Sequence, residues 1–391
     1  HFQAEDGIRD TRTCLVGSEM CIRDRPKATP TYPELCCHTL HDLEVLDTRE
    51  KVAYAVDDNA RALHEDLLGP FWMGKSMRDL ILSQMTSEWH NAYEAGIFTE
   101  FMEQRSPGHT VLDNKIYGKG MLDFKAEIQR SLDRLDFIAD PLAYDKQEEL
   151  RAMVIVADAI IRLGERHAET ALVLASLESD PLRKAELERI ADVCSHVPAH
   201  KPRNFWEALQ YYWFVHLGVT TELNPWDAFN PGRLDQHLFP FYEAGLADGS
   251  LTREQAEELL HCLWIKFNNQ PAPPKVGVTA AESSTYTDFA QINTGGVKED
   301  GSDAVNEVTY LLLDVIEEMR LLQPSSSVQL SKKNPDRFIQ RAAKIIRTGF
   351  GQPSIFNTDV VVQEMIRAGK SVEDARNGGT SGCVETGAFG K

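Results

Sequence analysis

Apolar and polar positions along the chain predict a protein dominated by helices. Residues 153–163 are apolar on almost every side, which is typical of a helix buried inside a large protein. Residues 205–217 form a second long run, rich in aromatic side chains. Amphipathic periods predict three more helices, over residues 252–267, 303–318 and 334–348, the last opened by an Asn-Pro-Asp start signal.

The predicted strands are fewer and shorter. The candidates are residues 326–330, residues 354–356 and the approach to Ile292, each bounded by Gly, Pro or Asn. Because long helical segments separate these strands, the order of elements favours an α/β architecture. The sequence shows no internal repeat, linker or low-complexity stretch.

Composition narrows the class of protein. With 391 residues, of which 42% are hydrophobic, the chain can bury a large core. The formal net charge of −19 argues against nucleic acid or an anionic membrane as a partner. No apolar run approaches the roughly 20 residues of a membrane span. A soluble, cytoplasmic protein is therefore expected.

The cysteines predict neither disulfides nor a metal centre. Outside residues 1–25 the chain has an odd, widely spaced set: Cys36, Cys37, Cys194, Cys262 and Cys383. Such spacing suits a reducing compartment rather than a disulfide framework. Neither Cys36-Cys37-His38 nor Cys194-Ser195-His196 has a second ligand pair at zinc spacing, so no metal site is predicted.

Residues 378–388, Gly-Gly-Thr-Ser-Gly-Cys-Val-Glu-Thr-Gly-Ala, carry the candidate chemistry. The glycines allow a tight loop and a close approach of substrate. In an extended tip, Cys383 and Glu385 would point to one side, which brings a reactive thiol beside a carboxylate base. The alternative interpretation is that Cys383 is a small buried hydrophobic residue.

Gly382-Cys383-Val384-Glu385 resembles the active-site loop of glycyl radical enzymes of the pyruvate formate-lyase superfamily. Further segments match the family in the expected order: Asn204–Gln210, Pro231–Gln236, Ile292–Gly296 and Ile355–Asn357. The resemblance runs from about Pro33 to the last residue, and several ordered motifs are hard to obtain by chance.

The resemblance implies an α/β fold built as a ten-stranded barrel surrounded by many helices, with the cysteine loop in its closed, water-free centre. It also implies that a glycyl radical oxidises Cys383 to a thiyl radical, which takes hydrogen from the substrate while Glu385 removes a hydroxyl proton. No other bound cofactor is expected. A radical S-adenosylmethionine activating enzyme and a small-molecule substrate are the implied partners, and the full-length protein is expected to be a homodimer that works anaerobically.

The substrate is left more open. Residues 220–236 and the cysteine loop look most like isethionate sulfite-lyase, which favours C–S cleavage of isethionate to acetaldehyde and sulfite. The alternatives within the superfamily are dehydratases of propanediol, glycerol or hydroxyproline, choline trimethylamine-lyase and arylacetate decarboxylases. An alternative of another class is an inactive fragment or pseudoenzyme that only binds small molecules.

Other polar residues are weaker candidates for substrate binding. Arg105 and His109 flank a Pro-Gly turn, where the guanidinium could face an anion, although a solvated surface loop explains them equally well. Trp226-Asp227 and Gln329 could line the barrel. Arg233 and Asp235, two residues apart, could do so too, but such a pair is more often structural.

The two ends of the sequence call for separate treatment. Residues 1–25 resemble translated sequencing-adapter DNA and are predicted to be a non-native leader that contributes nothing to the fold. Residues 26–391 are then a pyruvate formate-lyase-type domain that stops just after the cysteine loop. The family's glycine radical segment follows well downstream, so the fragment alone is expected to be inactive.

Overall fold

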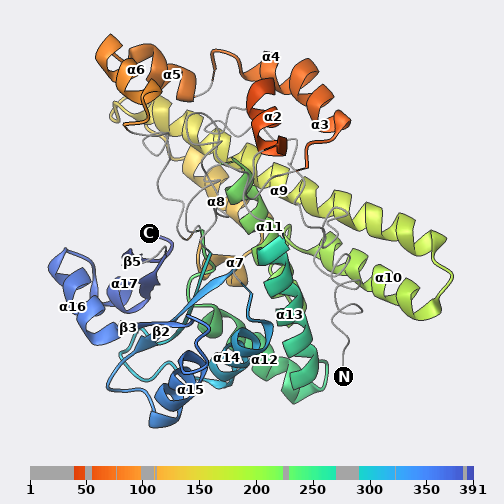
Figure 1. Ribbon diagram of the computed structural model, residues 1–391, viewed down its shortest axis with the longest axis vertical. Coiled ribbons are helices and arrows are strands. Elements are labelled where there is room, and N and C mark those ends of the chain that lie inside the picture. Colours follow the sequence, from red (N-terminus) through yellow and green to blue (C-terminus); the bar gives the residue numbers. More distant parts are fainter. Residues whose placement is uncertain are drawn as a thin grey trace.

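The computed structural model describes residues 39–48, 55–75, 77–97, 110, 112–222, 229–269, 290–321, 323–381 and 385–391. The first helices are short and form a group at one end of the molecule (Figure 1). They are α2 (Leu40–Thr48), α3 (Asp58–Leu63), the π-helix His64–Leu68, α4 (Gly69–Trp72), α5 (Met77–Gln84) and α6 (Ser87–Glu94). The predicted leader, residues 1–25, lies outside the described residues.

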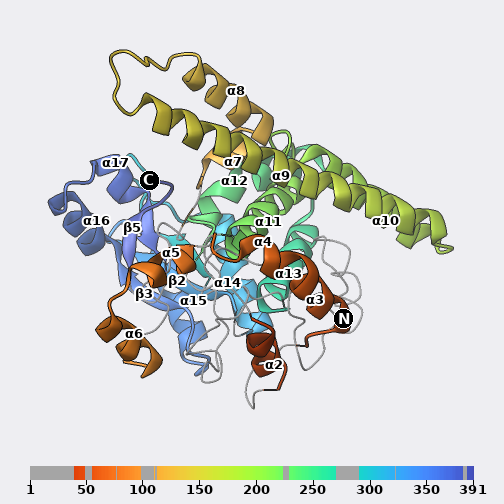
Figure 2. The ribbon, with the colours of Figure 1, turned by 90° about the horizontal axis from the view of Figure 1, so that it is seen from above.

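A layer of long helices follows, seen edge-on in Figure 2. After the single turn α7 (Lys115–Gly118) it consists of α8 (Met121–Leu132), α9 (Ala143–Leu177) and α10 (Pro181–His196). The buried stripe of α9 is made of small residues: Ala143, Ala157, Gly164, Ala168, Ala171 and Ala175. A Cβ added at Gly164 would lie 2.7 Å from Cδ of Pro198, so this stripe allows close packing.

The prediction of a fully buried helix over residues 153–163 is wrong, although the segment is helical. Ile155 and Val156 on α9 are 69% and 61% exposed. The reason is that α9 is held through its narrow stripe of small residues, and the described residues leave the large apolar side chains on its other faces mostly uncovered.

The main hydrophobic core lies among α11 (Phe205–Glu222), α12 (Leu234–Asp248), α13 (Arg253–Asn269) and α14 (Glu307–Met319). The largest buried side chains include Phe205, Trp213 and Trp264. The predicted helices are confirmed here. Helix α14 begins later than predicted because Asn306 caps it, accepting from the amides of Val308 and Thr309.

A parallel sheet packs against this core (Figure 1). Its strands run in the order β1 (Gln291–Gly295), β2 (Ser325–Leu330) and β3 (Ser354–Asn357). Helices α15 (Asp336–Ile346) and α16 (Thr358–Arg367) follow β2 and β3, as expected of parallel strands. All three predicted strands and the α/β class are confirmed; the ten-stranded barrel stays a prediction.

The two faces of the sheet differ in chemistry. Ile292 and Val328 are buried in the apolar core, whereas Asn293 aligns with Ser327 in the register of β1 and β2. Since side chains alternate along a strand, Asn293, Ser327 and Gln329 share the other face. That polar face receives the cysteine segment, which follows α17 (Val372–Arg376).

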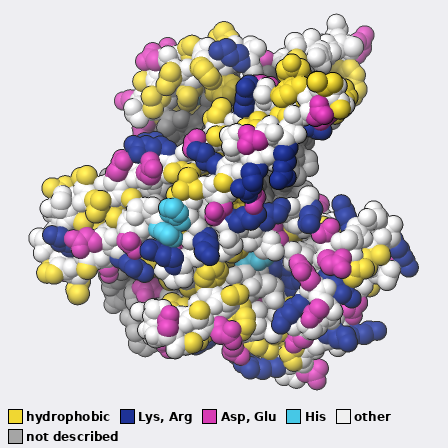
Figure 3. Space-filling model, turned by 180° about the vertical axis from the view of Figure 1, so that it is seen from behind, with side chains coloured by type: hydrophobic (Ala, Val, Ile, Leu, Met, Phe, Trp, Pro, Cys, Tyr) yellow, Lys and Arg dark blue, Asp and Glu magenta, His cyan; other side chains and the backbone are white. Residues whose placement is uncertain are grey.

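The surface mixes charges of both signs. Figure 3 shows Lys and Arg interspersed with Asp and Glu over one face, with apolar side chains among them. None of the described helices is long and apolar enough to cross a membrane.

Candidate functional site

The cysteine segment forms an antiparallel hairpin. Strand β4 (Gly378–Thr380) pairs with β5 (Thr386–Ala388), and the amide of Ser381 donates to the carbonyl of Glu385 at 2.9 Å. The tip between Ser381 and Glu385 is therefore three residues long and has Cys383 at its middle position. Gly382, Cys383 and Val384 themselves lie outside the described residues.

Two glycines let the hairpin pack closely. A Cβ added at Gly378 would lie 2.3 Å from the carbonyl oxygen of Gly387. A Cβ at Gly379 would lie 2.7 Å from Oδ1 of Asn293 and 2.8 Å from Cζ of Phe389. Gly378 thus allows the two hairpin strands to pair closely, and Gly379 allows the hairpin to contact the sheet.

Asn293 fastens the hairpin to strand β1. Its Nδ2 donates to the carbonyl of Thr380 at 2.7 Å, and its Oδ1 accepts from the amide and the hydroxyl of Thr380, both at 3.0 Å. Oδ1 also accepts from Oγ of Ser327 at 3.1 Å and from Nε2 of Gln329 at 2.9 Å. All four residues are buried. The loop that carries Cys383 is thus supported by a closed polar network.

Gln329 and Asn293 differ in how readily the sequence reveals them. Gln329 is a possible inward polar group by its sequence, and it does point to the interior, where it supports Asn293. Sequence reasoning missed Asn293, although it stands in the Ile-Asn-Thr-Gly-Gly motif. A polar residue inside an otherwise buried strand was the signal available.

Arg233 and Asp235 are structural, as their spacing suggests. The buried guanidinium of Arg233 donates to the carbonyl oxygens of Gly295, Val297 and Arg376. Burial lowers the pKa of Arg233, and the charge of Asp235 partly offsets this. Asp235 Oδ2 accepts from the amide of Gly295 at 2.8 Å. The pair thereby ties the end of β1 to the chain entering the hairpin.

Asp113 anchors the hairpin from a second side. Its carboxylate accepts from Nδ2 of Asn377, directly before β4, and lies 2.9 Å from Nε2 of His237. Beyond β5, the amide of Gly390 donates to the carbonyl of Thr110 at 3.2 Å. Thr110 is the first described residue after Arg105 and His109 in the sequence. This contact therefore places Thr110 at the base of the hairpin.

The remaining predicted site residues divide into two groups. Arg105, His109, Cys383, Trp226 and Asp227 lie outside the described residues. Glu385 is described, and its side chain is exposed. The described residues thus do not enclose Glu385, and the water-free centre stays a prediction.

The other described cysteines suit no catalytic role. Cys194 and Cys262 are buried. Burial raises the pKa of the Cys194 thiol to about 12, so it stays protonated at neutral pH. Nε2 of His196 lies 3.0 Å from the carbonyl oxygen of Lys201, as expected of helix-end chemistry.

Comparison with known proteins places this hairpin in a family. The family model described as pyruvate formate lyase-like matches residues 8–391. The chain belongs to this family of glycyl radical enzymes. Within the matched range, Arg233 of Pro231–Gln236 bonds to the end of β1, and Asn293 of Ile292–Gly296 bonds to the hairpin.

Curated relatives span more than one chemistry. Trans-4-hydroxy-L-proline dehydratase of Clostridioides difficile is 58% identical over 368 residues, which cover 94% of this chain and 47% of the relative. Isethionate sulfite-lyase of Oleidesulfovibrio alaskensis is 32% identical over 368 residues, covering 90% of this chain and 44% of the relative. The chain thus spans about half the length of these relatives.

Solved structures give the same picture. The crystal structure of hydroxyproline dehydratase from Clostridioides difficile with trans-4-hydroxy-L-proline bound matches with a TM-score of 0.88 and 57% identity, covering 97% of this chain and 48% of that one. The glycerol-bound form of the B12-independent glycerol dehydratase from Clostridium butyricum matches with a TM-score of 0.83 and 30% identity, with coverage of 97% and 48%. The comparisons support a radical eliminase or dehydratase and do not specifically support isethionate.

Proposed function

We propose that this chain is part of a glycyl radical dehydratase that removes water from trans-4-hydroxy-L-proline. The observation that carries the proposal is the 58% identity to a hydroxyproline dehydratase, against 32% to an isethionate sulfite-lyase over an equally long alignment. The motif Gly382–Glu385 on a supported hairpin suits either reaction, so the choice of substrate rests on the comparison.

Cys383 and Glu385 would carry the chemistry. The glycyl radical, which the family places on a segment beyond this hairpin, supplies the one-electron oxidation of the Cys383 thiol. In trans-4-hydroxy-L-proline the hydroxyl stands on C4, and the neighbouring C5 is bonded to the ring nitrogen. Hydrogen transfer from C5 to the Cys383 sulfur leaves a carbon radical that the nitrogen lone pair stabilises.

Proton transfer would then complete the elimination. The carboxyl of Glu385 gives a proton to the C4 hydroxyl, which leaves as water, and regains a proton from the ring nitrogen. Cys383 returns its hydrogen to C4. The substrate has then lost one water and gained a C=N bond, and both side chains are restored.

The hairpin supports would matter by fixing the geometry of these two residues. A misplacement of about 1 Å at a reacting group can cost about 100-fold in rate. Asn293 and Asp113 hold the chain at and before β4 from two sides, and this is the support that the proposed geometry requires.

The test uses the full-length protein, activated anaerobically by its radical S-adenosylmethionine enzyme. Equal samples receive trans-4-hydroxy-L-proline, isethionate, glycerol, propane-1,2-diol and choline. The expected result is a cyclic imine from hydroxyproline and no sulfite from isethionate. Sulfite and acetaldehyde from isethionate, without turnover of hydroxyproline, would refute the dehydratase and restore the sulfite-lyase interpretation.

Three substitutions separate the roles of the residues. Cys383→Ser is expected to abolish turnover while the radical signal measured by electron paramagnetic resonance persists. Glu385→Gln should lower kcat by at least about 100-fold, the usual contribution of a positioned acid or base. Glu373→Gln, an exposed glutamate on the nearby α17, is the matched control and should leave kcat unchanged.

Arg105 gives a further discrimination between substrates. If a sulfonate were the substrate group, a guanidinium would be its natural partner and Arg105→Ala would raise the KM for isethionate. Hydroxyproline also carries a carboxylate, so the same substitution should raise the KM for hydroxyproline if Arg105 binds that group. An unchanged KM for the substrate that is turned over would remove Arg105 from the site.

A further inference from the structure

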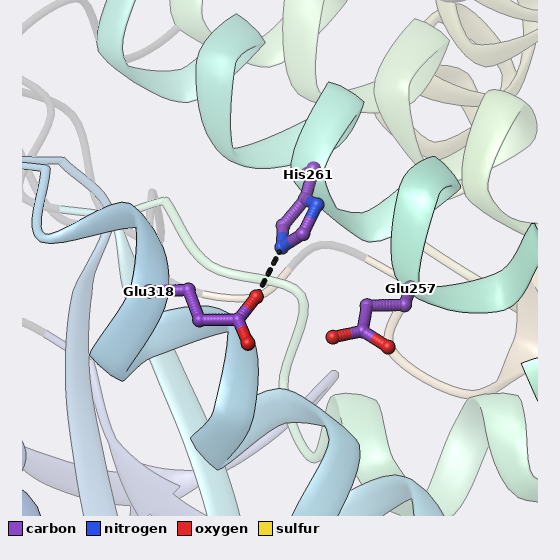
Figure 4. Close-up of side chains that lie close together, drawn as sticks. All are labelled: Glu257, His261 and Glu318. Atoms are coloured by element: carbon purple, nitrogen blue, oxygen red, sulfur yellow. Dashed lines mark ion pairs between the residues drawn. The ribbon is translucent and has the colours of Figure 1, made fainter. Parts of the chain in front are cut away.

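A second cluster of polar side chains lies away from the hairpin, between helices α13 and α14. Glu257 and His261 stand one turn apart on α13, and Glu318 faces them from α14 (Figure 4). One ligand atom from each of the three residues lies within 4.8 Å of the other two. Two neighbouring helices thus bring one imidazole nitrogen and two carboxylates to a single point.

His261 is only partly satisfied by its neighbours. Its Nε2 lies 3.2 Å from Oε2 of Glu318, yet this buried nitrogen makes no hydrogen bond with any described residue. A buried imidazole nitrogen without a hydrogen bond is uncommon, because burial removes its water partners. The ring is aimed into the cluster, where its lone pair could bind a cation.

The charges of the cluster also favour a cation. Glu257 and Glu318 carry like charges, and their carboxylates come together in the cluster. Arg253 donates to Asp314 at 2.7 Å, and Arg341 also pairs with Asp314, at 2.8 Å. Since both arginines are engaged by Asp314, a divalent ion between Glu257 and Glu318 would relieve their mutual repulsion.

We propose that Glu257, His261 and Glu318 form a binding site for a divalent transition-metal ion, best fitted by Zn²⁺. Zinc accepts imidazole nitrogen and carboxylate oxygen at about 2.0–2.2 Å, with water in the remaining position. Ligands that share an ion at this distance lie at most about 4.4 Å apart, so a small turn of the glutamate side chains closes the site. An imidazole ligand disfavours Mg²⁺ and Ca²⁺, which prefer oxygen.

The surroundings allow the ion to enter and would give it a structural role. The side chains of His261 and Glu318 are 30% and 55% exposed, so water can reach the site and complete the coordination. An ion bound there would join α13 to α14, two helices of the main core. The cluster takes no part in the proposed chemistry of Cys383 and Glu385, and its test does not depend on catalytic activity.

The test measures zinc binding to the whole chain after treatment with a chelator. Equilibrium dialysis against ZnCl₂ should show one saturable ion per chain, not displaced by excess Mg²⁺. His261→Ala and Glu257→Gln should each weaken binding at least about tenfold, since even losing a group that only orients a ligand costs 10–100-fold. Glu258→Gln removes the same charge from the next position of α13 and should bind zinc as the unchanged chain does.

Cobalt distinguishes this site from adventitious binding by cysteines. Co²⁺ at Glu257, His261 and Glu318 should give weak visible bands and no thiolate charge-transfer band, and Glu318→Gln, at an exposed position, should remove those bands without unfolding. Circular dichroism in chelator confirms that each variant is folded. The proposal is overturned by an absence of saturable binding, by affinity unchanged in His261→Ala, or by a cobalt spectrum dominated by thiolate.

Discussion

Replacing Asn293 by alanine tests whether one buried side chain holds the cysteine hairpin in place. The substitution removes the amide that bonds the backbone of Thr380 in both directions. It leaves three buried groups without their partner: the amide and the carbonyl of Thr380, and Nε2 of Gln329. The hydroxyls of Thr380 and Ser327 still have each other, at 3.1 Å.

The magnitude follows from those three groups. Each buried polar group left without a partner costs about 1–3 kcal/mol. The space left by the Asn293 side chain is polar and can admit a water molecule, which restores part of the lost hydrogen bonding. We therefore expect a net cost of about 3 kcal/mol, near the lower end of the summed cost of the three groups. Because the broken hydrogen bonds join the hairpin to the sheet, the cost should appear as local opening of the hairpin.

Hydrogen exchange at the Thr380 amide measures the loss of this hydrogen bond together with any opening of the hairpin. A loss of about 3 kcal/mol corresponds to roughly 100-fold faster exchange. Ser326→Ala is the matched control, because Ser326 is a buried serine in the same sheet whose hydroxyl bonds to Gln352 rather than to the hairpin. Exchange at Thr380 within a few-fold of the unchanged chain in Asn293→Ala would show that the hairpin is held by other contacts.

Two further predictions concern packing and pH. Gly379→Ala places a Cβ 2.7 Å from Asn293 Oδ1 and should cost about 1–3 kcal/mol of stability, which lowers the melting temperature. Gly387→Ala is the control, because its Cβ meets nothing within 4 Å and should leave the melting temperature unchanged. Equal melting temperatures of the two variants would contradict the packing argument. Burial lowers the pKa of His216 to about 3. Below about pH 6.5 the unfolded chain therefore binds a proton on this residue that the folded chain does not bind. As the pH is lowered below that value, the free energy of unfolding should decrease by about 1.4 kcal/mol per pH unit. The variant His216→Gln should lack this contribution between pH 6.5 and 5, and identical pH profiles of melting temperature would contradict it.

Local sequence patterns were enough to predict the elements and the class of the fold. The periods over residues 252–267 and 334–348 became α13 and α15, and the short segments bounded by Gly, Pro or Asn became three parallel strands. These features depend on alternation within a few residues, which any single sequence displays. The exposure of Ile155 could not be predicted, because it depends on which other segments cover α9.

Sequence reasoning identified the two residues proposed for catalysis but not all of the residues that hold their loop in place. The spacing of Cys383 and Glu385 indicated a pair on one loop, and the glycines around them indicated a tight loop. The side chains that hold that hairpin come from Asp113, Arg233 and Asn293, which are far apart in sequence. The cluster of Glu257, His261 and Glu318 was missed for the same reason, since its third member lies on another helix.

The supports of the hairpin act on its backbone and not on the side chain proposed as acid and base. Asn293 and Arg233 bond to backbone atoms of the stem and its approach, and none of these hydrogen bonds involves Glu385. A residue that holds the stem by its backbone does not constrain which substrate sits above the tip. We therefore expect the choice of substrate to depend on side chains outside this network. The stem can stay the same while the chemistry above it changes.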